Sequence, residues 1–171
     1  DASAKSWPSP VGPALVLDEL IVKGVATAHD ANWSKVSAKL YGGTAHGKAT
    51  VSWRKGVQLK GNRDVNRVEM HKIAPMLSFR THVSGKLDAK PAFTASAPSV
   101  SRLINALRVE TPFSVHNGVL CGVDIQKAAT VLITQAATGG ETHFDQLSGQ
   151  LVMEHGSYRF TQLKIVSEAL A

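Results

Sequence analysis

Cysteine and long apolar runs are scarce in this sequence, and each scarcity excludes a class of protein. The 171 residues include one cysteine, Cys121, so no internal disulfide can form and a small disulfide-stapled module is excluded. Cys121 lies in an apolar row, which predicts a small buried side chain rather than a reactive thiol. No run of about 18 apolar residues occurs, so this piece is not expected to span a bilayer as a helix.

Aromatic residues are also few, at 6% of the chain, and the positive charge is not concentrated. The formal net charge is +6, but the 19 Lys and Arg residues are spread along the whole length. Grooves for nucleic acid usually combine clustered basic residues with aromatic rings on which bases stack, so we expect no nucleic-acid partner. Anionic lipid headgroups are the alternative partner, since each basic side chain near such a surface contributes about 1 kcal/mol of attraction.

The residue types of a hydrolase site occur together in GGETHFDQLSGQLVMEHGSYRF, residues 139–160. If this segment is a strand, His143 and Asp145 point to one face about 7 Å apart, and Ser148 points to the other. A base must lie within about 3 Å of its nucleophile, so one extended segment cannot bring the three together. The G-x-S-x-G turn of many hydrolases is also missing. We predict that the protein is not an enzyme and has no catalytic residues; a triad completed by remote residues is the alternative.

Metal and phosphate motifs are missing as well. Seven histidines are present, but none forms H-x-H or H-x-x-x-H, and the cysteine has no second cysteine to pair with at a metal. The pairs Gly42-Gly43 and Gly139-Gly140 lack the spacing of phosphate-binding loops and are typical of turns that need a positive φ. We expect no metal and no cofactor.

What the sequence does contain is a period of two, which is typical of half-buried antiparallel strands. In TAHGKATVSW, small and apolar residues from Ala45 to Trp53 alternate with polar ones. Turn signals between such runs predict hairpins at residues 54–56, at Asn117-Gly118 and at residues 155–157. A change of apolar parity predicts a bulge near residues 161–162. Repeated hairpins of this kind build a meander.

Two segments have helical spacing instead. In DVNRVEMHKIAPML, residues 64–77, Asp64 is a candidate N-cap and Pro75 shortens or kinks the helix. In PSVSRLINALRV, Ser99 is a candidate N-cap and precedes an apolar stripe at i, i+3, i+4 and i+7 spacing. Because such short helices are marginal in water, each is expected to pack on a sheet. The start of the chain is rich in Ser, Pro and Ala and predicts a linker or tail over residues 1–13, followed by a β domain over residues 14–171.

The order of several motifs resembles the C-terminal region of AsmA-like proteins. TPFSVHNGVLCGVDIQKAA is followed by GGETHFDQLSGQLVMEHGSYRF and LKIVSEAL, in the order that this family shows. Upstream, KLYGGTAHGKATVSW resembles the family's Tyr-Gly-Gly unit. The resemblance covers roughly residues 14–171, and PMLSFRTHVSGKLD departs from it because family members often have a longer glycine-rich connection there.

The resemblance implies a fold and a location. The fold is mainly β with two short helices (α+β), a curved antiparallel meander that forms a groove or half-open barrel with an apolar inside. The protein is then a non-catalytic periplasmic domain that handles phospholipid or another acyl lipid and contributes to outer-membrane homeostasis. Membrane association is expected through an inner-membrane anchor in a segment absent from this chain. The start at Asp1 and the apolar alternation that still runs at SEALA indicate a piece excised from a longer protein and truncated at both ends.

Physical reasoning from the residues agrees with this expectation. Two short helices cannot cover the apolar face of a large sheet, so the sheet folds over on itself or leaves part of that face for a ligand or partner. Exposing a 16-carbon acyl chain to water costs roughly 12 kcal/mol at about 0.8 kcal/mol per CH₂, and an apolar groove removes most of that cost. The expected groove residues are Val51, Trp53, Phe79, Val83, Leu87, Val119, Val123, Leu151, Met153, Tyr158 and Phe160. The alternatives are a closed β-sandwich core and a structural or protein–protein interaction module that binds other envelope proteins without lipid.

Overall fold

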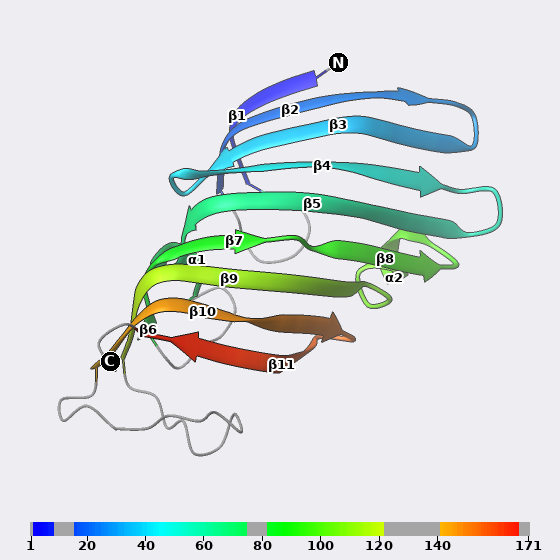
Figure 1. Cartoon of the computed structure of the whole chain (residues 1–171). Helices are drawn as coiled ribbons and strands as arrows, with labels where there is room; N and C mark the ends of the chain where they lie inside the picture. The colour runs from blue at the N-terminus through cyan, green and yellow to red at the C-terminus, as the bar shows by residue number, and fades with distance from the viewer. Residues whose placement is uncertain (1, 9–15, 75–81, 122–140, 168–171) are drawn as a thin grey trace.

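The computed structural model describes residues 2–8, 16–74, 82–121 and 141–167, most of which lie in strands (Figure 1). The strands are β1 (Ala2–Pro8), β2 (Val16–Ala26), β3 (Asp30–Leu40), β4 (Gly43–Ser52), β5 (Val57–Glu69), β6 (His82–Val83), β7 (Lys86–Ala89), β8 (Ala92–Ala97), β9 (Arg108–Cys121), β10 (Glu141–Glu154) and β11 (Ser157–Val166). The helices among these residues are α1 (Met70–Ile73) and α2 (Val100–Leu103), about one turn each. The predicted mainly β fold with two short helices is confirmed.

Within the described residues, all the strands belong to one antiparallel sheet whose order nearly follows the sequence. The order from edge to edge is β1-β2-β3-β4-β5-β7-β9-β10-β11. β7 and β8 lie one after the other between β5 and β9, and the short β6 pairs with β9. The result is a curved meander, as predicted (Figure 1). β1 and β11 form its two edges.

The register sorts the side chains onto an apolar face and a polar face, because residues paired across strands share a face. One apolar row consists of Leu20, Ala38, Ala45, Val65, Ala89, Phe113 and Gly149. A second consists of Trp33, Ala49, Gly61, Phe93, Val109, Met153 and Tyr158. The alternate positions carry polar rows, such as Thr50, Lys60, Thr94, Arg108 and Glu154.

The tightest packing lies where α1 meets the apolar face. Met70 of α1 packs with Val115, Leu120 and Phe144 of the two long neighbouring strands. A second cluster lies beside it around Val68, and Val68 and Val115 are the largest side chains in the described residues that are fully buried. The meander is therefore anchored at this end by two clusters of buried apolar side chains.

Phenylalanine rings lie across glycines on neighbouring strands of the apolar face. The Phe93 ring occupies the space where a β-carbon on Gly61 would be, and Phe144 does the same at Gly118. At Gly149, a β-carbon would lie 2.7 Å from Leu163 Cδ2 and 3.2 Å from Phe113 Cζ. Glycine at these positions lets large side chains lie close against the sheet, which is one way to stabilise a strand that contains glycine.

Several turn predictions are confirmed. Hairpins connect β4 to β5 at residues 53–56 and β10 to β11 at residues 155–156. The predicted bulge near residues 161–162 is present, because the β10–β11 register shifts between Ser148 and Gln150 and Gln162 has a φ of 55°.

The hairpin predicted at Asn117-Gly118 is wrong, because both residues lie inside β9. Asn117 has a φ of 50°, but the chain does not reverse there. His116 pairs with Gln146 and Gly118 pairs with Phe144, so the pairing with β10 continues on both sides. Asn117 therefore adopts the left-handed conformation inside a long strand, and Gly118 leaves room for the Phe144 ring.

The helix predicted over residues 64–77 is also wrong for its first part. Asp64 lies in β5 and is not an N-cap; the residue that precedes α1 is Glu69. The register shifts between Val65 and Val68, and Arg67 has a φ of 56°, which marks a bulge. Because of the bulge, Val65 and Val68 lie on the same face although they are three positions apart. This spacing is also typical of a helix.

Three further expectations differ from the structure. Ser99 precedes α2, but its hydroxyl hydrogen-bonds the Ser101 hydroxyl at 3.0 Å and does not cap the helix. Val100 and Ile104, in the stripe expected to pack, are 69% and 52% exposed. Residues 2–8, expected to belong to a tail, form β1, since backbone pairing with β2 extends the sheet despite the Ser- and Ala-rich sequence.

Candidate functional site: the apolar face of the sheet

The apolar face away from α1 is a broad surface that the described residues only partly cover. Leu59, Leu151 and Met153 are half-buried, and Tyr158 is 42% exposed. α2, the helix at this end, contacts β8 and β5, but Val100 is exposed and no residue of α2 is fully buried. A sheet with one such face offers a continuous surface to an apolar ligand or partner.

Seven of the predicted groove residues lie on the apolar face. They are Val51, Val83, Leu87, Leu151, Met153, Tyr158 and Phe160. Val83 and Leu87 belong to the core at α1, whereas the others lie toward the opposite end or along β11. Trp53 lies at the margin, just past β4, where its indole Nε1 donates a hydrogen bond to the Ala28 carbonyl at 2.7 Å. Phe79 and Val123 lie outside the described residues.

Val119 is a correction, because it lies on the polar face. It stands between Gly118 and Leu120, which are buried on the apolar face, so strand alternation points Val119 the other way. Cys121 shares this alternate position and is half-buried, not fully buried as expected. The run Val-Leu-Cys is apolar at every position, so the sequence does not show which of these side chains face the apolar side of the sheet. The pairing with the neighbouring strand decides this.

Sequence reasoning missed several residues that build this face. The rings of Phe93, Phe113 and Phe144 are central to it, and Phe113 meets Phe160 edge-on with 6.0 Å between ring centroids. A signal for them was present: each ring lies against a glycine of a neighbouring strand. The pairing that brings glycine and ring together connects segments distant in sequence, so the signal is visible only once the register is known.

Arg63 is an unexpected member of the apolar face. It lies in a row with Val22, Val36 and Gly47, and its neighbours along β5 on the same face are Gly61 and Val65. Its guanidinium carbon lies 5.9 Å from the centre of the Phe93 ring. The side chain is half-buried, and removal from water lowers the pKa of the guanidinium from its usual value.

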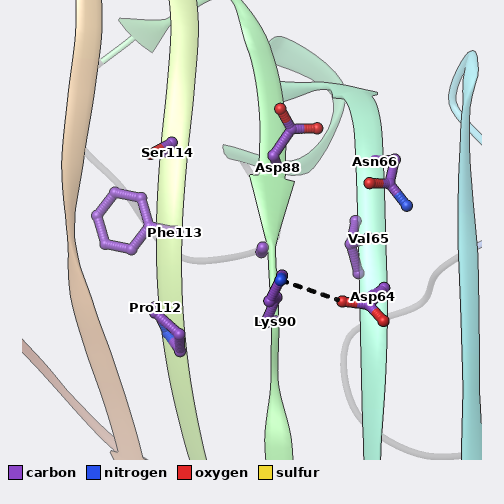
Figure 2. Close-up of a pocket in the computed structure, with 9 residues that line it drawn as sticks. Asp64, Val65, Asn66, Asp88, Lys90, Pro112, Phe113 and Ser114 are labelled. Atoms are coloured by element: carbon purple, nitrogen blue, oxygen red, sulfur yellow. Dashed lines mark ion pairs between the residues drawn. The ribbon is translucent and has the colours of Figure 1, made fainter.

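The polar face carries open hollows rather than a closed pocket. One has a volume of about 790 Å³ and is lined mainly by hydroxyl, amide and charged side chains of β4, β5, β8 and β9, together with Glu154 of β10. A smaller hollow between β5, β7 and β9 is shown in Figure 2, where Lys90 approaches Asp64 with 4.0 Å between Nζ and Oδ1. In the larger hollow, the Asp30 carboxylate accepts a hydrogen bond from the Ser52 hydroxyl.

Ion pairs of the polar face link neighbouring strands. Glu69 accepts from Lys72 at 3.2 Å and from Lys86 at 3.3 Å, and these two ammonium groups lower the pKa of its carboxyl. Arg54 donates to Asp30 at 2.8 Å and lowers the pKa of that carboxyl. These exposed pairs stabilise the register more than they supply chemistry.

The candidate triad does not assemble, although one detail of its prediction is wrong. Phe144 and Leu147 both pack into the core at α1 although they are three residues apart, so the alternation of β10 shifts between them. His143 and Ser148 therefore lie on the same face and not on opposite ones. They are five residues apart on one strand, or about 16 Å at roughly 3.3 Å per residue, so they cannot exchange a proton directly. In the described part of the chain, no three His, Cys, Asp or Glu side chains gather as metal ligands would.

Comparisons with protein-family models, curated proteins and solved structures gave no match to this chain. The AsmA-like resemblance therefore stays a prediction from the motifs. None of the helices in the described ranges is long and apolar enough to cross a membrane.

Proposed function

We propose that this chain handles lipid, holding acyl chains against the apolar face of its sheet without catalysing a reaction. The observation that carries the proposal is the broad, half-exposed apolar face at the end remote from α1, which includes Leu151, Met153 and Tyr158. An acyl chain needs only apolar surface, and its transfer from water gains about 0.8 kcal/mol per CH₂.

The AsmA-like resemblance supports the same function. It would make the lipid a phospholipid, in a protein of the bacterial envelope that is tied to the inner membrane. The periplasmic location follows from that resemblance only, and it stays a prediction.

Two adjacent residues of β10 provide a matched test. Leu151 pairs with Thr111 and Phe160 on the apolar face, whereas Val152 pairs with Glu110 and Arg159 on the polar face, and both are half-buried. A photoreactive amino acid at position 151 should crosslink to a phospholipid added in detergent micelles, and the same amino acid at position 152 should not. Mass spectrometry of the irradiated protein detects the adduct. Equal adducts at both positions, or none at position 151, would contradict the proposal.

A second candidate function is a protein–protein interaction module that binds no lipid. The observation that favours it is the pair of sheet edges, since among the described strands β1 and β11 each pair with one other strand. Edge strands present unpaired backbone groups that can pair with another chain. Light scattering after size exclusion, with and without detergent, separates the two functions. A stable oligomer together with no lipid adduct at position 151 would favour the second.

A further inference from the structure

On the apolar face of the described strands, the residues paired from strand to strand form rows, and Arg63 is the charged residue in these rows. The row through Val22, Val36 and Gly47 ends at Arg63, and the adjoining rows contain only apolar residues and glycine. The other lysines and arginines of the central strands, such as Lys48 and Lys60, occupy the alternate positions on the polar face. A single cation at this place departs from the pattern of the whole sheet.

The side chain of Arg63 is held in place by two features of its neighbours. A β-carbon on Gly47 would lie 2.8 Å from Arg63 Cγ, so glycine at position 47 leaves room for the arginine stem. The Phe93 ring, 5.9 Å from the guanidinium carbon, provides a surface for a cation–π contact. This arrangement orients the guanidinium before any ligand arrives.

The guanidinium has no carboxylate to pair with in the part of the chain that the structure describes. The next residue, Asp64, points to the other face, where it lies 4.0 Å from Lys90. Asp88 accepts a hydrogen bond from the Arg67 backbone N–H at 2.8 Å and lies 3.4 Å from His116. An arginine stays charged in proteins, so this partly desolvated cation lacks a counter-ion that its five N–H donors could bind.

We propose that Arg63 is the anion-binding residue of the apolar face, where it takes the phosphate group of a lipid whose acyl chains lie along the neighbouring apolar rows. Guanidinium binds phosphate through two parallel N–H···O bonds, and these bonds are stronger where water is partly excluded. Gly61 and Val65 flank Arg63 on the same face, and Ala45 and Ala49 lie beside it on β4, so apolar surface for the chains begins at the cation itself. This inference rests on the proposed lipid-handling function and adds the chemical class of the lipid.

The test compares two fluorescent lipids with the same chains, a phosphatidic acid and the corresponding uncharged diacylglycerol. Each is titrated against the full chain and against Arg63→Gln, Arg63→Lys and Lys60→Gln. Lys60→Gln removes one positive charge from the same strand but from the polar face, so it controls for net charge. Thermal unfolding followed by circular dichroism shows that each variant is folded.

Arg63→Gln should weaken binding of the phosphatidic acid by about 10- to 100-fold, the loss of one or two charge-assisted hydrogen bonds, and leave diacylglycerol binding unchanged. Lys60→Gln should change neither, and Arg63→Lys should retain part of the preference for the charged lipid. An Arg63→Gln variant that keeps the wild-type ratio of the two affinities, or that loses both lipids equally, overturns the inference and leaves the lipid function in place.

The remaining outcomes separate the inference from the proposed function. If the wild-type chain binds neither lipid, the lipid function fails. In that case, titration with inorganic phosphate decides whether Arg63 binds anions at all. Phosphate binding that disappears in Arg63→Gln supports an anion site for free phosphate, and no phosphate binding overturns the site.

Discussion

Gly61 gives a sharp test of the packing on the apolar face. Its φ is not in the left-handed region, so alanine fits the backbone conformation and any cost comes from contacts. In Gly61→Ala the new methyl group would overlap the Phe93 ring and would lie 2.5 Å from the carbonyl oxygen of Lys48. The ring can tilt away, but the oxygen belongs to the backbone of the paired strand β4 and cannot move without shifting the sheet.

We therefore expect Gly61→Ala to lower the free energy of unfolding by about 2 to 3 kcal/mol, the upper part of the range for overpacking by one carbon. For a chain of this size, that corresponds to a fall in the melting temperature of roughly 4 to 12 °C. Urea unfolding followed by far-ultraviolet circular dichroism measures the change. Gly149→Ala is the matched control, because its closest clash is with the end of the Leu163 side chain, which can rotate. If Gly61→Ala is within about 0.5 kcal/mol of wild type, or costs less than Gly149→Ala, the steric reasoning is refuted.

Two further predictions concern the core and the pH dependence of stability. Val115 is 1% exposed and Val25 is 72% exposed, so Val115→Ala should cost roughly 2 to 3 kcal/mol in urea unfolding while Val25→Ala stays within about 0.5 kcal/mol of wild type. Glu69 has its pKa lowered below 4.5 by Lys72 and Lys86, so its contribution to stability is present above that value and is lost as the pH falls through the lowered pKa. A Glu69→Gln variant should lose stability less steeply than wild type as the pH falls below about 4.5, and identical slopes in the two proteins would exclude this contribution.

The alternation of polar and apolar residues was sufficient to predict the sheet. The period of two around Ala45 predicted β4, and local turn signals predicted the hairpins that flank β5 and β11. These features depend on a few adjacent residues, and no distant contact overrides them. The predicted apolar face of β10, with Leu151 and Met153, holds for the same reason.

The predictions from sequence were wrong where a strand changes which of its alternate residues face the apolar side of the sheet. Bulges place Val65 and Val68 on one face, and a similar shift does so for Phe144 and Leu147; both pairs are three residues apart. From the sequence, the first spacing predicted a helix and the second left Phe144 unrecognised. Arg63 was missed for a related reason: it directly precedes the segment predicted as a helix, so the sequence did not assign it to a strand face. The register that corrects each error comes from pairing with another strand, which a single segment does not specify.

The order of the strands makes the sheet extendable. From β1 to β5, and again from β9 to β11, each strand pairs with the next one along the chain, so each hairpin depends mainly on its immediate neighbours. In such nearly one-dimensional architectures, stability is close to a sum of unit and neighbour contributions. Adding or deleting a hairpin at the β1 edge would lengthen or shorten the apolar face and leave the core around Val115 intact, because no residue of β1 or β2 belongs to that core. The width of the surface is therefore a property that evolution, or an engineer, can change in steps of one hairpin.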